Sequence, residues 1–269
     1  MEQNRRVYPA ERGGRAARYA LLLLAVVLLI PGLLGRGQEL SVQPVVQETP
    51  MPEAFDETMA QKDITLPEAR WYALQVGAFE NEEAARTLAG QFAKRGAAGY
   101  VWTDGRCRVL AAAYPSREDA QLVRQQLSQQ HQVESYLYEI DFPAIQLHMK
   151  GMQGQLDIWE AAFLHGHDLA AQLQSVSVAM DRQEMSVQEA ADALAALAQQ
   201  VEGVSLRLKQ RFRLPGHEAV SGLIELFDSY GDFAPTVAEQ SASAAGTLVK
   251  KEQLEVLWRL KRIYALFEE

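Results

Sequence analysis

The sequence has few of the residues that build reactive or metal-binding centres. Its 269 residues include one cysteine, Cys107, and five histidines, none of them in a His-Glu-x-x-His pattern. A lone cysteine excludes an intrachain disulfide and the paired spacing of a zinc or thiol-redox site. We therefore expect Cys107 to be an inward-facing strand residue, and we expect neither a cofactor nor a metal.

The sequence also offers no clear catalytic cluster. The one local grouping, His165-Gly166-His167-Asp168, has its two histidines two positions apart, so on a helix they point to different sides. No histidine base is paired in sequence with Cys107, as a thiol nucleophile requires. The sequence therefore predicts a protein that is not an enzyme, with surface or interface histidines.

No folded part of the chain has the excess of Lys and Arg that nucleic-acid binding requires. The net charge of the chain is −9. Residues 71–140 hold seven basic and eight acidic residues, and residues 141–269 hold eleven basic and eighteen acidic ones, which gives −7. Nucleic acid is therefore not an expected partner.

Only one long hydrophobic run is present, and it lies near the N-terminus. Tyr19 to Leu34 contains no charged residue, and a helix of this length rises about 24 Å, slightly less than a hydrocarbon core of about 30 Å. Five arginines precede the run, which predicts a cytoplasmic tail over residues 1–18. We expect residues 19–35 to form a single transmembrane helix. A cleaved signal peptide is the alternative, although no Ala-x-Ala site follows; either way, the rest of the chain lies outside the cytoplasm.

The next segment, residues 36–70, shows no clear apolar period. It contains four prolines, and its acidic residues outnumber its basic ones. This composition predicts a flexible extracytoplasmic linker between the membrane and a folded domain.

Residues 71–140 show one pattern of strand and helix signals twice. In Trp71–Phe79, the residues Tyr72, Leu74 and Val76 alternate with Ala73, Gln75 and Gly77, which is typical of a strand with one buried face. Asn81 is a good helix N-cap after the first strand, and Ser116 is its counterpart in the second half. The order β-α-β, β-α-β predicts an α+β fold with a four-stranded antiparallel sheet, both helices on one face and the other face open.

This stretch resembles a SPOR (sporulation-related repeat) domain. The resemblance is carried by Gln75-Val76-Gly77-Ala78-Phe79, an alanine-rich helix, Gly96, and an Arg-Val strand that ends in Tyr114-Pro115-Ser116. It implies that the open sheet face binds peptidoglycan glycan strands that lack stem peptides. One departure concerns the third strand, where Ala112-Ala113 replaces the Gly, often Gly-Pro, that members usually carry.

Strand alternation predicts which side chains lie on the open face. Gln75, which matches the glutamine of the family's first strand, has an amide that both donates to and accepts from sugar groups. On the second strand, either Val101 or the pair Tyr100 and Trp102 faces the glycan, and we favour Trp102. The predicted substrate-binding residues are Gln75, Trp102, Arg106, Arg108, Tyr136 and Tyr138.

After Phe142-Pro143, the spacing of apolar residues becomes helical over residues 143–269. Stripes with alternating steps of three and four begin at Leu156, Val187 and Val220, and Ser186 and Glu189 form a capping-box pattern. After Pro235 a last helix is expected, with Leu254, Leu257, Leu260 and Ile263 among its apolar residues. Such steps favour antiparallel helices, so we expect a bundle of three or four. Small residues in the first stripe, such as Gly166, fit either a close helix approach or an interrupted helix.

Together these features predict a single-pass membrane protein whose SPOR-like domain binds stripped glycan. Such glycan marks sites of cell-wall remodelling, at the division septum or during sporulation. The helical bundle would then engage a protein partner. The alternative is a scaffold of a membrane and cell-wall complex whose SPOR-like sheet binds protein and is covered by the bundle or by a partner.

Overall fold

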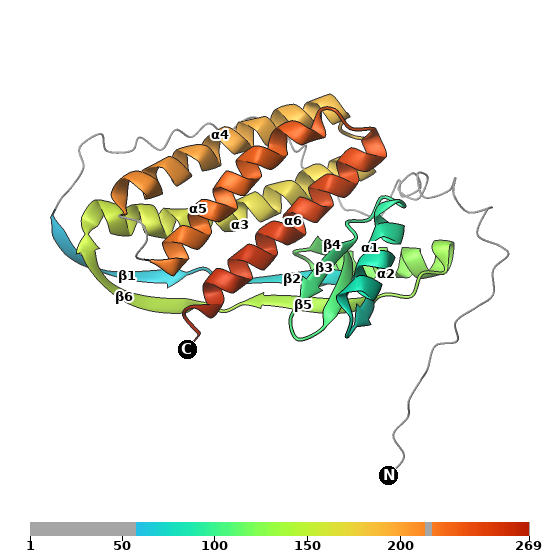
Figure 1. Cartoon of the computed structure of the whole chain (residues 1–269), viewed down its shortest axis with the longest axis horizontal. Coiled ribbons are helices and arrows are strands. Elements are labelled where there is room, and N and C mark those ends of the chain that lie inside the picture. Colours follow the sequence, from blue (N-terminus) through green and yellow to red (C-terminus); the bar gives the residue numbers. More distant parts are fainter. Residues whose placement is uncertain (1–57, 213–216, 269) are drawn as a thin grey trace, which may run out of the picture.

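The computed structural model describes residues 58–212 and 217–268, which form an α+β fold (Figure 1). Its strands are β1 (Met59–Leu66), β2 (Ala69–Phe79), β3 (Tyr100–Thr103), β4 (Cys107–Tyr114), β5 (Tyr136–Phe142) and β6 (Ile145–Met152). Its helices are α1 (Glu82–Ala93), α2 (Arg117–His131), α3 (Gln153–Asp181), α4 (Val187–Arg211), α5 (Glu218–Phe233), η3 (Ala234–Val237) and α6 (Ala242–Ala265). The transmembrane helix expected at 19–35 lies outside the described residues, and no described helix has the length and apolar character of a membrane span.

The predicted four-stranded sheet is present, with antiparallel strands in the order β3-β4-β2-β5. Helices α1 and α2 pack on one face of it, where Leu74, Val109 and Ala111 are buried. Asn81 and Ser116 cap these helices through their side chains, as expected. Despite the Ala112-Ala113 departure, β4 continues as a strand to Tyr114, although its register with β2 shifts between the pairs Ala73↔Ala113 and Gln75↔Leu110. This part of the sequence-based prediction is therefore confirmed.

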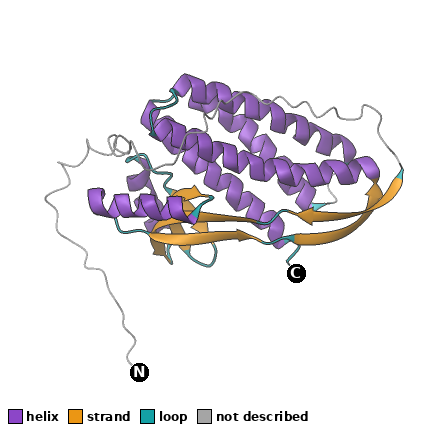
Figure 2. Cartoon of the chain, turned by 180° about the vertical axis from the view of Figure 1, so that it is seen from behind, coloured by secondary structure: helices purple, strands orange, loops and turns teal. Residues whose placement is uncertain are grey.

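Strands β1 and β6 were not expected. They pair antiparallel from Met59↔Met152 to Leu66↔Ile145 and continue the β2–β5 pair as a long ribbon beneath the helices (Figure 2). Residues 59–66 and 69–70 of the expected linker are therefore strand residues, and the rest of that linker up to residue 57 lies outside the described residues. The bundle expected from residue 143 is preceded by strand β6. In β1 only Ile64 and Leu66 are fully buried, so the apolar alternation is too short to identify the strand.

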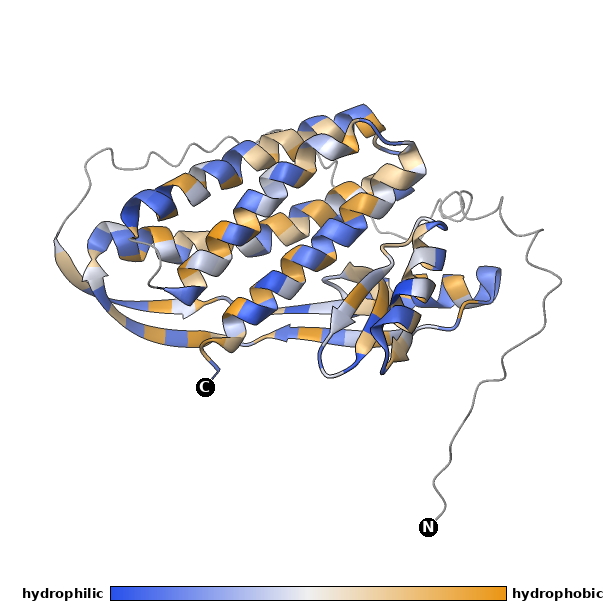
Figure 3. Cartoon of the chain, viewed as in Figure 1, coloured by the Kyte–Doolittle hydropathy of each residue, from blue (hydrophilic) through white to orange (hydrophobic). Residues whose placement is uncertain are grey.

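The C-terminal part is a four-helix bundle of α3, α4, α5 and α6, and each helix carries both hydrophobic and hydrophilic residues (Figure 3). The predicted apolar stripes are the buried faces, and Ser186 and Glu189 form the predicted capping box. Helix α3 continues through Gly166 without interruption, so the small residues of its stripe serve close helix approach.

That close approach gives a testable difference between two helix glycines. A Cβ added at Gly166 would lie 2.8 Å from Leu260 Cδ2 on α6, whereas a Cβ at Gly203 on α4 would meet nothing within 4 Å. Gly166→Ala should lower the free energy of unfolding by about 1–3 kcal/mol, because it overpacks the α3–α6 contact. Gly203→Ala should raise it by about 0.5–1 kcal/mol, because alanine favours a helix. Urea unfolding of both variants checks this, and equal effects would contradict the packing described.

The face of the sheet opposite α1 and α2 is largely covered by α6. One continuous core joins Trp71, Ala73 and Leu110 of the sheet to the buried faces of the bundle helices. Polar contacts follow the same boundary: Gln253 Nε2 donates to the Ala113 carbonyl oxygen at 3.1 Å, and Tyr100 Oη donates to Glu255 Oε2 at 2.8 Å. The sheet and the bundle therefore share one core, and the sheet face is only partly open.

A buried lysine reinforces this junction. Lys250 of α6 is 7% exposed, and its Nζ donates to Asp181 Oδ1 at 2.6 Å and to the Gly96 carbonyl oxygen at 3.0 Å. A buried ammonium is costly unless it is paired and hydrogen-bonded. Its two partners come from α3 and from the segment after α1, so Lys250 is satisfied only when the bundle and the sheet domain are docked.

Candidate functional site

The structure places the predicted binding residues on the sheet face opposite α1 and α2. Val101 packs toward α1, whereas Tyr100 and Trp102 lie on the other face, which decides between the two orientations left open for the second strand. Cys107 is buried on the α1 side and unpaired, as expected. Strand alternation places Gly77 on the same face as Gln75, but in the structure Gly77 faces Leu88 of α1, because the β2–β4 register shifts between Gln75 and Gly77.

Trp102 has the expected direction but is not accessible. Its side chain is 3% exposed and belongs to the core shared with the bundle. Its ring meets the Tyr138 ring edge-on, with centroids 6.1 Å apart. Trp102 therefore packs against Tyr138 from within the shared core and presents no exposed ring face to a sugar.

The remaining predicted residues gather where the sheet extends beyond α6. We call this surface the end patch; it consists of Gln75, Asp104, Arg106, Arg108, Tyr136 and Tyr138. Cross-strand pairing brings Gln75 of β2 next to Tyr136 of β5. Tyr136 is 63% exposed, and Arg106 is also exposed.

Arg108 organises the end patch. Its Nη1 donates to Gln75 Oε1 at 2.9 Å, and its Nε donates to Asp104 Oδ1 at 2.9 Å. Its guanidinium also lies over the Tyr138 ring, 4.8 Å from the centroid, in a cation–π contact. Because one side chain holds three others, the patch is pre-organised before any ligand arrives.

Asp104 completes the network and was missed by the sequence analysis. It follows β3, and its Oδ2 accepts a hydrogen bond from Tyr138 Oη at 2.5 Å. Burial raises the pKa of Tyr138, and this contact with the Asp104 carboxylate raises it further, so the phenol stays protonated and donates. A turn residue with no apolar period gives no sequence signal of this role.

The end patch combines the groups that carbohydrate recognition uses. It offers amide, guanidinium and carboxylate groups for hydroxyl and N-acetyl groups, together with the exposed aromatic ring of Tyr136 for stacking against a sugar ring. Its geometry provides no nucleophile with an adjacent base. The arrangement is suited to binding a polar chain.

The His165-Gly166-His167-Asp168 grouping plays a structural part. No group of three or more potential metal ligands is found among the described residues. His167 Nε2 lies 2.8 Å from Tyr264 Oη, which donates to the Pro67 carbonyl oxygen at 2.7 Å. Because the tyrosine proton is directed to Pro67, His167 Nε2 carries the hydrogen in this contact. The pair joins α3 and α6 to the bend between β1 and β2.

His167 should make the fold sensitive to mild acid. Burial lowers its pKa from 6.5 to about 4. Between these values the unfolded chain binds the proton first, so the contribution of His167 to stability falls as the pH drops, by about 2 kcal/mol at pH 5. Above pH 6.5 both states are neutral and the histidine contributes nothing. Chemical denaturation at pH 7.5 and pH 5 should show this extra loss in the wild type and not in His167→Gln.

The control for this experiment is His148→Gln. His148 lies on the ribbon, and its side chain is 78% exposed beside Asp63. This variant shows whether the loss of any histidine produces the change expected for His167→Gln. If His167→Gln and the wild type lose the same stability between the two pH values, the account of His167 is wrong.

Comparison with known proteins identifies the domain that carries the end patch. The family model described as SPOR domain matches residues 69–139, so this part of the chain is similar to a SPOR domain. SPOR domains bind peptidoglycan, which supports a role connected with the cell wall. No curated protein and no solved structure matches the chain.

Proposed function

We propose that the protein binds peptidoglycan glycan strands lacking stem peptides, and that it does so through the end patch. The observation that carries this proposal is the Gln75–Arg108–Asp104–Tyr138 network beside exposed Tyr136. These residues lie within the SPOR domain match. In this proposal the protein acts by binding alone.

The proposal includes attachment to the membrane. Residues 19–35 cross the cytoplasmic membrane once, the N-terminus is cytoplasmic, and the folded part lies outside. Residues 36–57 then tether the ribbon to the membrane; 22 extended residues reach about 70–80 Å. Glycan binding would hold the protein where stem peptides have been removed, at a division septum or in sporulation.

Co-sedimentation with whole sacculi tests this function. The full chain in detergent is the right material, because Trp71 and Leu110 lie in the core shared with the bundle, and an isolated sheet domain would expose them. We expect stronger binding to sacculi treated with an amidase, which removes stem peptides, than to untreated sacculi. Gln75→Ala should weaken the binding, because it removes a group at the centre of the end patch. Equal, weak sedimentation with both preparations would refute the proposal.

A second candidate function is favoured by one specific observation. Trp71, Tyr100 and Trp102 are buried in the core that the sheet shares with the bundle, so less than the whole sheet face is available to a ligand. In a scaffold of a membrane and cell-wall complex, the remaining face and the bundle would bind protein. Failure to bind either type of sacculus, together with recovery of one stoichiometric protein partner from crosslinked cells, would favour this scaffold.

In the glycan-binding proposal the bundle has two tasks. It buries one part of the sheet face and presents the outer surfaces of α4 and α5 to a protein partner. Leu206 on α4 is 54% exposed, although it lies on a helix whose other leucines are buried. Leu206→Glu would weaken partner binding while leaving glycan binding unchanged.

A further inference from the structure

The two arginines of the end patch differ in whether their guanidinium is already paired with a carboxylate. Arg108 is paired with Asp104 and bonded to Gln75, and its side chain is 25% exposed. Arg106 is exposed, and within the described part of the chain its guanidinium has no ion pair or hydrogen bond. The end patch therefore holds one neutralised arginine and one available cation.

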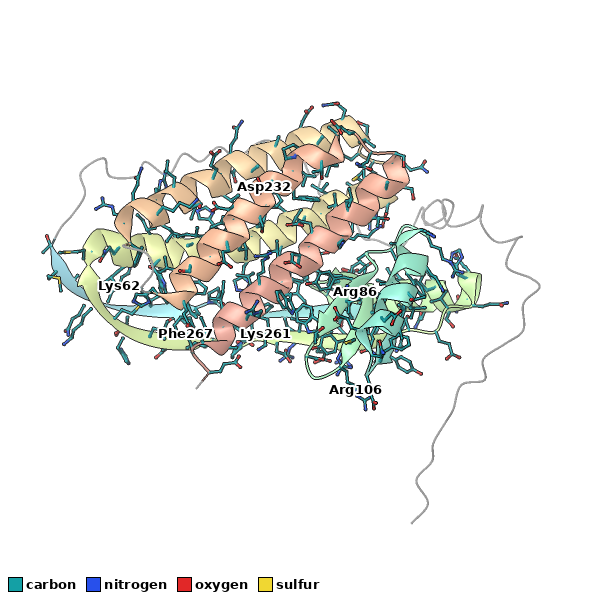
Figure 4. The ribbon with its side chains drawn as sticks, in the orientation of Figure 1. Lys62, Arg86, Arg106, Asp232, Lys261 and Phe267 are labelled. Carbon is teal, nitrogen blue, oxygen red and sulfur yellow. The ribbon has the colours of Figure 1, made fainter. Side chains whose placement is uncertain are left out.

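The turn between β3 and β4 fixes the position of that cation. Gly105 has a φ of 88°, and the Asp104 N–H donates to the Arg106 carbonyl oxygen at 3.2 Å, so the hairpin turn is tight. Cys107 points toward α1, so Arg108, which follows it on β4, points to the other face. Arg106 lies in the turn that precedes β4 and is exposed. Figure 4 shows Arg106 at the side of the sheet domain away from the bundle.

The chemistry of stem-peptide removal creates a group that such a cation recognises. The peptide is joined to the lactyl group of the sugar by an amide, which is neutral. Hydrolysis of that amide leaves a carboxylate on the lactyl group, so the stripped glycan carries a negative charge where the intact glycan has none. A guanidinium pairs with a carboxylate through two parallel hydrogen bonds, and it has no comparable interaction with an amide.

We propose that Arg106 recognises the lactyl carboxylate that is exposed when a stem peptide is removed. The charge of Arg108 is already paired with Asp104, so Arg108 does not bind this carboxylate and acts instead as a positioning residue for Gln75 and Tyr138. Selectivity for stripped glycan then comes from one charge pair, in addition to the absence of a bulky peptide. This inference rests on the proposed glycan-binding function.

The test compares three soluble probes with the full chain in detergent. The first is amidase-treated glycan, the second is the same glycan after its lactyl carboxylates are coupled to methylamine, and the third is a chitin oligosaccharide, which has no lactyl group. We expect the wild type to bind the first probe about ten- to a hundredfold more tightly than the second and third. Arg106→Gln should remove most of this preference, and Arg106→Lys should restore part of it.

Arg86→Gln is the matched control. The substitution removes the same charge from the same domain. Arg86 itself lies on α1, where it pairs with Glu82, and α1 packs on the face of the sheet opposite the end patch (Figure 4). This variant should keep the full preference. Raising the salt concentration should weaken binding of the first probe far more than that of the second, because only the first relies on a charge pair.

The outcomes separate the inference from the function. If the wild type binds the first two probes equally, or if Arg106→Gln keeps the preference, the role of Arg106 is refuted while glycan binding stands. If the wild type binds none of the three probes, the proposed function itself fails. Circular dichroism of Arg106→Gln should match the wild type, because the side chain is exposed and makes no hydrogen bond or ion pair within the described fold.

Discussion

Arg108→Ala should weaken binding to stripped glycan by about ten- to a hundredfold, the largest loss expected from any single change in the end patch. The substitution releases Gln75 and removes the cation from the Tyr138 ring. It also leaves the Asp104 carboxylate without its ion-pair partner. Arg108→Lys should restore little, because one ammonium cannot reproduce the planar contacts to all three side chains. Sedimentation with amidase-treated sacculi measures the effect.

The chain offers a close control in Arg117→Ala. Arg117 also pairs with a carboxylate, that of Glu139 at 3.2 Å, and lies over a tyrosine ring, that of Tyr72. Tyr72 faces α1 and α2, so this arrangement lies on the other side of the same sheet. Arg117→Ala should therefore bind stripped glycan as the wild type does. A similar loss in both variants would show that Arg108 acts through general stability or charge.

Leu110→Ala should have the largest effect on stability, lowering the free energy of unfolding by about 2–5 kcal/mol. Leu110 is fully buried on β4, in the core that joins the sheet to the bundle. Because the core is shared, the variant should unfold in one transition, in which sheet and helix signals are lost together at a lower denaturant concentration. Unfolding followed by tryptophan fluorescence and by far-ultraviolet circular dichroism checks this.

Leu122→Ala serves as the comparison for this prediction. Leu122 lies on α2 and is 42% exposed, so its loss should change stability by about 0.5 kcal/mol or less. Two separate transitions in the wild type, one for the sheet domain and one for the bundle, would contradict a shared core. So would a Leu110→Ala variant that loses the sheet while the bundle keeps its full stability.

Local patterns were sufficient to predict most of the secondary structure. Alternation in β2 and β4 identified their buried faces, and Asn81, Ser116 and Ser186 identified the starts of three helices through a mechanism that depends on neighbouring residues alone. The bundle stripes were predicted for the same reason, since the burial of a helix face follows its periodicity. These features are encoded within about twenty residues of sequence.

What could not be predicted depends on contacts between distant segments. Strand β1 is stabilised by β6, about 90 residues later, and Lys62 pairs with Asp157 and Glu160 of α3. Neither strand has a strong pattern of its own, so β1 was assigned to a linker and β6 to the bundle. The covering of the sheet by α6 has the same origin, because nothing in the Trp102 strand indicates which helix will pack on it.

For the candidate site, too, the sequence predicted only those features that depend on local pattern. Alternation gave the correct side for Gln75, Arg108 and Tyr138, but it could not show that Trp102 would be buried. Asp104 was not identified because its role depends on Tyr138, which is 34 residues away in the chain. The binding roles of these residues stay predictions until ligand binding is measured.

Amide hydrogen exchange of the full chain, with and without stripped glycan fragments, tests the central claim most directly. The claim is that glycan binds at the end patch while α6 remains on the sheet. We predict slower exchange at the β3–β4 turn and at the start of β5, near Tyr136, with no change in α6 (Ala242–Ala265). Faster exchange in α6, or protection confined to elements outside the end patch, would contradict the claim.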